Sequence, residues 1–173
     1  MKQSNTSKYA YLAGAIDSDG CIEITKGQKN DRPNPTYRIR LRVNQFDGRM
    51  VDYLYGAFGG FLITSYNKLR KKNYYTWQIE CNKAYYILNR LIPFLRIKKK
   101  QAEIAVRFQQ HINKRKENTR RGIELSKKEL ELREQLFQDI RKEKHIYIPC
   151  AVVETKRSES SKKKICDSPN IKE

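Results

Sequence analysis

Residues 11–20, Tyr-Leu-Ala-Gly-Ala-Ile-Asp-Ser-Asp-Gly, decide how the rest of this chain is interpreted. They are typical of the second half of a helix that begins near Ser7, a residue type favoured at a helix N-cap. Small side chains and one acid recur along this helix at helical spacing, namely at Ala10, Ala13, Gly14 and Asp17. Because small residues let two backbones approach closely, we expect another helix to pack along this stripe.

The helix ends on two acids and a glycine. A helix dipole is negative at its carboxyl end, so Asp19 is destabilised by its position unless a positive charge lies nearby. A divalent cation would supply that charge; the alternative is that Asp17 and Asp19 are solvated turn residues. Gly20 is suited to the left-handed or tight turn that ends a helix.

Composition limits the possible functions. The chain has 173 residues, enough for one ordinary domain, and 38% of them are hydrophobic, enough for a core. A net charge of +18 predicts a polyanionic partner, with nucleic acid ahead of an anionic membrane. No apolar run approaches the roughly 20 residues of a membrane span, and we expect no membrane partner and no signal peptide.

The four cysteines lack the spacing of a zinc site or a C-x-x-C motif; they are Cys21, Cys81, Cys150 and Cys166. Free thiols are typical of a reduced intracellular protein. We expect either the cytoplasm of a prokaryote or an organelle such as a mitochondrion or chloroplast, and the sequence does not distinguish between them.

Alternating and helical periodicities predict an α+β fold. After the first helix come two hairpins with a helix after each, and the expected elements are strands 21–25 and 37–44, helix 47–58, strands 61–70 and 74–80, and helix 82–91. Two further helices are expected within residues 99–144. The strands form one four-stranded antiparallel sheet, with helices on one face and a polar second face.

The strand at residues 37–44 alternates cleanly. Apolar residues from Tyr37 to Val43 share one face, and the other face carries Arg38, Arg40, Arg42 and Asn44. A solvated outer face would explain three neighbouring arginines. The high net charge instead favours a surface that enters the DNA major groove, where arginine pairs with guanine.

Residues 12–20 closely resemble the helix motif of the LAGLIDADG homing endonucleases, from which they depart only at Ala15 and Ser18. The resemblance covers residues 7–101. It implies the αββαββα fold, here with extra C-terminal helices, and site-specific cutting of DNA. It also implies a catalytic Mg²⁺ bound by Asp19 and by the backbone carbonyl of Ser18, with Mn²⁺ or Ca²⁺ as alternative ions at the same site.

Three weaker matches follow the family's order, and the resemblance implies that Gln45, Arg49 and Lys98 surround the metal. Only one copy of the motif occurs. We therefore expect a homodimer in which the stripe of Ala10, Ala13, Gly14 and Asp17 meets its copy, with Asp17 capping the partner helix. Each subunit is then expected to cut one strand, leaving short 3′ overhangs.

Side-chain alternation gives the residues expected to contact DNA, which are Glu23, Thr25, Arg38, Arg40, Arg42, Tyr66, Lys68, Arg70, Thr76 and Gln78. Thr76 and Gln78 join this face if Trp77 and Ile79 are buried; the opposite parity would turn Tyr75 and Trp77 to the DNA. We expect residues 1–150 to form the endonuclease domain and residues 151–173 a basic, flexible tail.

Three other kinds of protein would also have a strongly basic chain. A non-cleaving repressor, or a maturase that binds intron RNA, could share this scaffold, although an acid at position 19 favours cleavage. A structural RNA-binding protein would explain the charge but not a small-residue helix that ends in two acids.

For the endonuclease, the target sequence is expected to be a long pseudo-palindrome of two half-sites, each about one 10-bp turn of DNA.

Overall fold

The computed structural model describes residues 5–28, 34–118 and 125–145. The expected tail (151–173) and part of the loop between the last two helices lie outside these residues. The elements in chain order are α1 (Asn5–Asp19), β1 (Gly20–Gly27), β2 (Thr36–Gln45), α2 (Gly48–Phe58), β3 (Phe61–Asn67), β4 (Lys72–Glu80), α3 (Cys81–Leu91), α4 (Lys99–Asn118) and α5 (Lys127–His145). The expected αββαββα order is confirmed, with two helices added after it.

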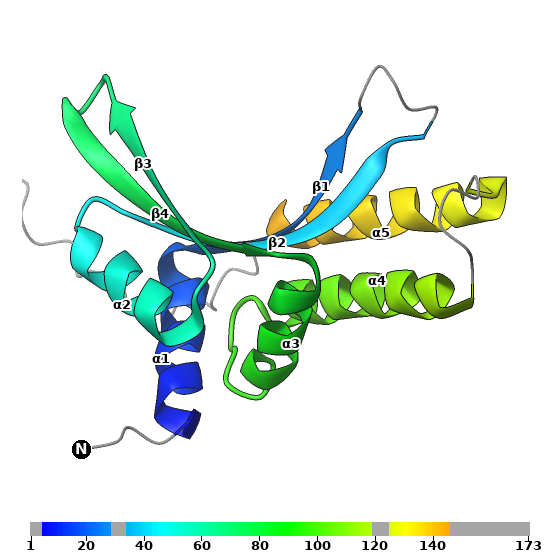
Figure 1. Ribbon diagram of the computed structural model, residues 1–173, viewed down its shortest axis with the longest axis horizontal. Helices are drawn as coiled ribbons and strands as arrows, with labels where there is room; N and C mark the ends of the chain where they lie inside the picture. The colour runs from blue at the N-terminus through cyan, green and yellow to red at the C-terminus, as the bar shows by residue number, and fades with distance from the viewer. Residues whose placement is uncertain (1–4, 29–33, 119–124, 146–173) are drawn as a thin grey trace, which may run out of the picture.

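One antiparallel sheet with strand order β1-β2-β4-β3 joins the two hairpins. In Figure 1 the hairpins diverge from the middle of the sheet, with α1, α2 and α3 on the same side of it. Helices α4 and α5 run side by side beneath the β1–β2 hairpin. The opposite side of the sheet carries no helix among the described residues, so it is open to a ligand.

The core lies between the sheet and the helices. Alternate residues of β2, from Tyr37 to Val43, are buried as predicted, and Trp77 and Ile79 are fully buried on β4. The helices contribute their apolar stripes, chiefly Leu12, Ile16, Leu54, Leu88, Leu91, Phe108 and Ile140. Burial of Trp77 and Ile79 resolves the parity of β4, so Gln78 lies on the open face of the sheet.

Of the left-handed and tight-turn conformations expected for Gly20, the left-handed one is not found. Gly20 is the first residue of β1, and among the described glycines only Gly59 and Gly60 have positive φ values. A Cβ atom on Gly20 would lie 2.5 Å from Ile16 Cα and 2.9 Å from Ile16 O. The glycine is needed here because β1 passes close over the last turn of α1. The φ of 60° at Gly59 does end α2, as expected.

The second hairpin differs from the prediction in length and in parity. Strand β3 ends at Asn67, and residues 68–71 form the turn, so Lys68 and Arg70 are turn residues. Ile63 pairs with Thr76, and Tyr66 pairs with Asn73. Directly paired residues point to the same face of a sheet. Tyr66 therefore lies on the Trp77 side, away from the arginines, which corrects its expected place.

Local signals for the helix starts are only partly right. Helix α2 is expected to begin at residue 47, and it begins at Gly48 with Asp47 as its cap; Ser126 Oγ accepts a hydrogen bond from Glu129 N at 3.3 Å before α5. Helix α3 is expected to begin at Asn82, but its cap is Glu80, and Asn82 Oδ1 accepts a hydrogen bond from Gln109 Nε2 of α4. In the described ranges no helix has the length and apolar character needed to span a membrane.

Candidate functional site

Asp19 lies exposed at the end of α1, beside the last residue of β2. Its Oδ2 atom accepts hydrogen bonds from Gln45 Nε2 at 2.8 Å and from Ser18 Oγ at 2.9 Å. The two segments meet because β1 and β2 pair in register, with Gly20 opposite Val43. The structure thus brings two of the expected site residues, Asp19 and Gln45, into direct contact.

Lys98 reaches the same helix end from the segment before α4. Its Nζ donates to the carbonyl oxygens of four residues of this turn, at distances of 2.6, 3.1, 3.3 and 2.8 Å for Ile16, Asp17, Ser18 and Gly20. Burial lowers the pKa of Lys98, although the charges of Asp17 and Asp19 act in the opposite direction. The chain itself therefore supplies a cation at the negative end of α1.

Asp17 is used inside the chain. Its two carboxylate oxygens accept hydrogen bonds from Arg96 N at 2.7 Å and from Lys98 N at 2.9 Å. These contacts fix the segment that carries Lys98 against the end of α1. Both oxygens of Asp17 are thus engaged by the chain's own backbone, whereas the expectation that Asp17 caps a partner helix concerns a second chain and stays a prediction.

Arg49 lies in the first turn of α2 but does not contact Asp19. Its guanidinium pairs with Asp47, and its side chain is 91% exposed. Hydrogen bonds from Arg49, first from its side chain and then from its backbone, lower the pKa of Asp47 to about 2. Arg49 and Gln45 both line a surface hollow of about 370 Å³, together with Tyr11. Arg49 is thus near Gln45 without being part of the Asp19 contacts.

Fewer residues are exposed on the outer side of α1 than the predicted small-residue stripe contained. Ala13 is only 1% exposed and packs into the core, so its expected place in an interface is wrong. Ala10 and Gly14 are exposed, and with Tyr11 and Ser18 they line a hollow of about 300 Å³. A Cβ atom on Gly14 would meet nothing within 4 Å, so packing inside the chain does not require a glycine there.

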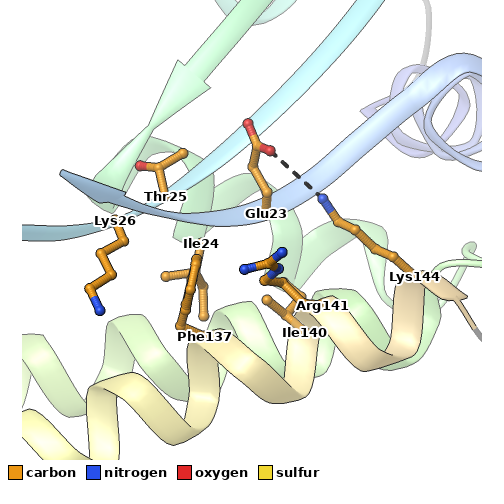
Figure 2. A pocket seen from close by; sticks show the side chains of 8 residues that line it. All are labelled: Glu23, Ile24, Thr25, Lys26, Phe137, Ile140, Arg141 and Lys144. Carbon is orange, nitrogen blue, oxygen red and sulfur yellow. Dashed lines mark ion pairs between the residues drawn. The ribbon is translucent and has the colours of Figure 1, made fainter.

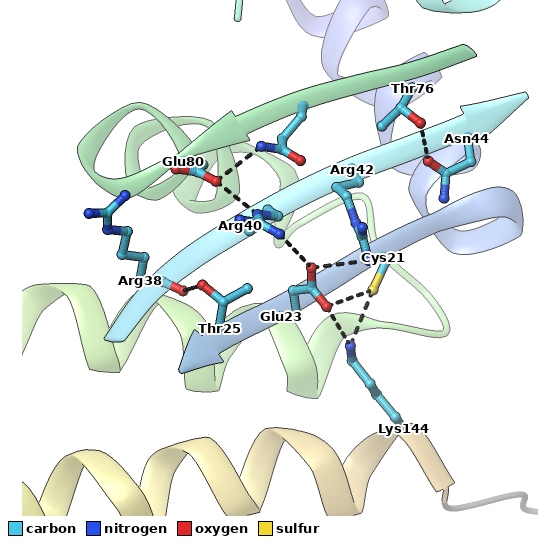
Figure 3. A network of polar contacts seen from close by, with 11 residues as sticks. Cys21, Glu23, Thr25, Arg38, Arg40, Arg42, Asn44, Thr76, Glu80 and Lys144 are labelled. Atoms are coloured by element: carbon cyan, nitrogen blue, oxygen red, sulfur yellow. Dashed lines mark hydrogen bonds and ion pairs between the residues drawn. The ribbon is translucent and has the colours of Figure 1, made fainter. Parts of the chain in front are cut away.

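The open face of the sheet carries arginines interleaved with acids (Figure 3). Glu23 Oε1 lies 3.1 Å from Arg42 and 3.8 Å from Arg40, and Glu80 Oε1 accepts from Arg40 Nε at 2.8 Å. Glu80 also accepts from Gln78 Nε2. The acids separate the positive charges of neighbouring arginines, and they hold these side chains in place.

Thr76 lies on this face, as expected. The residue is only 6% exposed, however, and offers little surface to a ligand. Its Oγ1 donates to Asn44 Oδ1 at 2.8 Å (Figure 3). Asn44 is exposed and continues the alternation of Arg38, Arg40 and Arg42. Asn44 is therefore a candidate DNA-contact residue outside the predicted set, although the alternation of the strand already predicted that it lies on this face.

Two further predicted contacts behave differently. The Arg70 guanidinium lies over the ring of Phe46 at 5.1 Å, and Phe46 packs edge-on against Tyr74. Thr25 Oγ1 donates to the backbone carbonyl of Arg38 at 3.3 Å. Arg70 thus folds from the turn toward the end of β2, whereas Thr25 ties β1 to β2.

Helix α5 brings an unpredicted lysine to the edge of this face. Residues of β1 and α5 line a hollow of about 340 Å³. In Figure 2 Lys144 reaches from α5 toward Glu23 on β1. Lys144 Nζ lies 3.7 Å from Glu23 Oε2 and donates to Cys21 Sγ at 3.1 Å. No local signal in the sequence could pair these residues, because they are far apart in the chain.

The comparisons with known proteins agree with this fold. A family model described as LAGLIDADG endonuclease matches residues 12–110, more than half of the chain. The chain belongs to this family of homing endonucleases. The single LAGLIDADG motif is typical of the branch with one motif per chain. No curated protein matches the sequence closely enough to be reported.

Solved LAGLIDADG homing endonucleases have the same fold. The chain is similar to I-CvuI in complex with its target, at TM-score 0.57 and 18% identity over 82% of this chain and 98% of that one. It is similar to the archaeal I-Vdi141I complexed with DNA, at TM-score 0.65 and 16% identity, with coverages of 81% and 86%. Against I-GzeII, at TM-score 0.56 and 16% identity, 77% of this chain matches 43% of the larger protein.

Proposed function

We propose that this LAGLIDADG protein is a site-specific DNA endonuclease that cuts a long pseudo-palindromic duplex as a homodimer. Each subunit hydrolyses one strand, the break has short 3′ overhangs, and the gene lies within an intron. Three solved relatives are described in complex with DNA, and I-Vdi141I is described as intron-encoded. The open face of the sheet and the net charge of +18 support the same partner.

One observation carries the proposal: the two acids of the motif differ in whether a carboxylate oxygen is left without a hydrogen-bond donor from the chain. Both oxygens of Asp17 accept backbone hydrogen bonds. Asp19 uses Oδ2 for Gln45 and Ser18, and in the described part of the chain nothing donates to its Oδ1 atom. Asp19 is therefore the carboxylate that can bind something from outside the chain.

The donors at this helix end fit a hard divalent cation. The Asp19 carboxylate would hold it together with the Ser18 carbonyl, whose second lone pair is available beside the hydrogen bond from Lys98 Nζ at 3.3 Å. Mg²⁺ is the first choice, with Mn²⁺ or Ca²⁺ as alternatives. Structures of I-CvuI are described in the presence of Ca and of Mg. When bound, such an ion polarises the scissile phosphodiester and lowers the pKa of a bound water. Gln45 holds the carboxylate in place, and Lys98 keeps the carbonyl end of α1 neutralised.

The proposed site lies between two subunits. Among the described residues no group of three His, Cys, Asp or Glu side chains could hold a metal, and a Mg²⁺ site usually combines one or two carboxylates with water and phosphate oxygens. The outer side of α1 is exposed at Ala10 and Gly14 and leads directly to Asp19. A two-fold axis along this side brings two Asp19 carboxylates together. The glycine at position 14, unnecessary inside the chain, supports close approach of a second helix.

Replacing Gly14 by leucine tests the dimer. The added side chain projects into open space in the single chain, so we expect folding to survive while the paired helices are forced apart. Sedimentation at micromolar concentration should give a dimer for the wild type and a monomer for Gly14→Leu. A wild-type monomer, or an unchanged dimer in the variant, would remove α1 as the interface.

Cleavage is tested on a plasmid library that carries randomised inserts, with Mg²⁺ present. We expect the wild type to linearise a subset of plasmids that share one pseudo-palindromic sequence. Asp19→Asn should still bind that sequence in a gel shift but should not cut it. The matched control is Asp52→Asn, an exposed acid on α2, which should cut normally. Sequence-specific binding without nicking in Mg²⁺ or Mn²⁺ would support a repressor, and preference for intron RNA a maturase.

A further inference from the structure

Two apolar side chains of β3 lie on the arginine face of the sheet. Phe61 is 61% exposed and Ile63 is 43% exposed. Phe61 pairs with Gln78 and Ile63 pairs with Thr76. Directly paired residues share a face, so both apolar side chains point to the open side.

The pairing continues across the sheet in rows. Gln78 pairs in turn with Arg42, and Thr76 pairs with Asn44. Phe61 and Ile63 therefore end two rows that begin with polar side chains on β2. Strand β3 is an edge strand of the sheet, and in Figure 1 it lies away from α4 and α5. The same surface thus changes from charged over β2 to apolar over β3.

We propose that Phe61 and Ile63 form a thymine-reading subsite, in which they contact the 5-methyl groups of thymines in the major groove. This inference rests on the proposed function, since it assigns part of the substrate's sequence. The thymine methyl is the apolar group that base pairs present in the major groove, and apolar side chains recognise it by contact. Gln78 and Arg42, which lie in the same row as Phe61, supply hydrogen-bonding groups for adjacent bases.

Charge favours DNA over a second protein copy on this surface. Each chain carries a net charge of +18. Arg42 lies in the Phe61 row on β2, Lys72 pairs with Asn67 at the other end of β3, and Arg70 is in the turn of the same hairpin. A second copy brought against this face would add like charge to like charge. A duplex brings phosphates that neutralise the lysines and arginines while its groove edge covers the apolar pair.

Spacing adds a constraint on the target. Residues two apart on a strand are separated by about 6.8 Å. Successive bases along one DNA strand are separated by about 3.4 Å. Phe61 and Ile63 therefore match two base-pair steps, and each half-site should carry thymines within a window of three base pairs.

The test uses the full chain and duplexes selected by binding from a randomised pool. We expect every selected half-site to contain a window rich in A·T pairs. Those thymines are then replaced by deoxyuridine, which removes the methyl group alone. Loss of one buried methyl weakens binding about four-fold. Replacing Ile63 by serine should weaken binding to the thymine duplex and abolish the difference between thymine and deoxyuridine at one position, and Phe61→Ser should do so at the other.

The matched control is Leu62→Ser. Leu62 is adjacent, equally exposed at 43%, and pairs with Trp77 on the opposite face. It should leave the thymine preference unchanged. If selection enriches a sequence without the A·T window, or if Ile63→Ser still distinguishes thymine from deoxyuridine, the subsite is refuted while the proposed function stands. If no sequence is enriched, both fail. If Ile63→Ser instead converts a dimer to a monomer, β3 is a protein interface and the subsite is refuted.

Discussion

Replacing Lys98 by methionine removes one ammonium group from the end of α1 and keeps an unbranched side chain of similar length. Lys98 Nζ donates to four carbonyl oxygens, with the shortest contacts at 2.6 Å to Ile16 and 2.8 Å to Gly20. An ammonium has three protons, so these contacts share donors. The change therefore leaves several helix-end carbonyls without their charged donor, and it removes the charge that offsets the helix dipole.

The expected loss is about 2 kcal/mol of unfolding free energy. A hydrogen bond to a charged group contributes about 1.5–3 kcal/mol, and two short ones set an upper limit of about 6 kcal/mol. Two effects reduce it. Burial opposes the charge, as the lowered pKa of Lys98 indicates, and water reaches the half-buried site in the variant. For a chain of this size, about 2 kcal/mol lowers the melting temperature by about 4–8 °C.

The assay is urea unfolding of Lys98→Met beside Lys99→Met. Lys99 is the exposed first residue of α4 and loses the same charge. We expect the Lys99 variant to stay within about 0.5 kcal/mol of the wild type, as surface substitutions do. Equal stability of the two variants would refute the reasoning, because it would mean that Nζ does not hold the end of α1. Cleavage should also fall in Lys98→Met, since the same turn carries Asp19.

Two other predictions concern folding. Gly20→Ala places a Cβ 2.5 Å from Ile16 Cα and should destabilise the chain by about 1–3 kcal/mol in urea unfolding. Gly56→Ala, at a helical glycine with open space, should gain about 0.5–1 kcal/mol, and equal effects of the two changes would contradict the close approach. Hydrogen bonds from Lys26, Tyr37 and Gln138 lower the pKa of Glu134 to about 2 from 4.5. A lowered carboxyl pKa stabilises the folded state above pH 4.5 and loses this effect as the pH falls toward 2. Thermal unfolding of the wild type and Glu134→Gln should therefore differ at neutral pH and converge near pH 2, and a constant difference would contradict this pairing.

Local signals predicted the elements that local energetics determine. The alternation of Arg38 to Val43 and the start of α2 after Asp47 depend on neighbours in the chain, and both were predicted. The LAGLIDADG motif predicted that Asp19 lies at the end of a helix. The order of residues in the family predicted that Gln45 lies near the same site, where it contacts Asp19.

Other features depend on contacts that the sequence does not encode locally. Phe61, Leu62 and Ile63 are all apolar, so β3 lacks the alternation that would fix its faces, and Tyr66 was assigned to the wrong one. Ala13 and Gly14 are both small, so helical spacing alone could not separate a core position from an exposed one. The contacts of Lys98 and Lys144 join distant segments: the family resemblance predicted only that Lys98 lies near the metal site, and nothing in the sequence predicted the position of Lys144.

The paired acids on the open face change what the arginines can do. Glu23 and Glu80 neutralise part of the charge of Arg40 and Arg42, whereas among the described residues Arg38 has no ion pair. Phosphate contacts need net positive charge, but base recognition needs a guanidinium held at a fixed position. Arg40 and Arg42, each held by an acid, therefore suit the recognition of base edges. If these arginines only added positive charge to the surface, acids beside them would not be needed. Arg38, unpaired and nearer the tip of the hairpin, suits a phosphate.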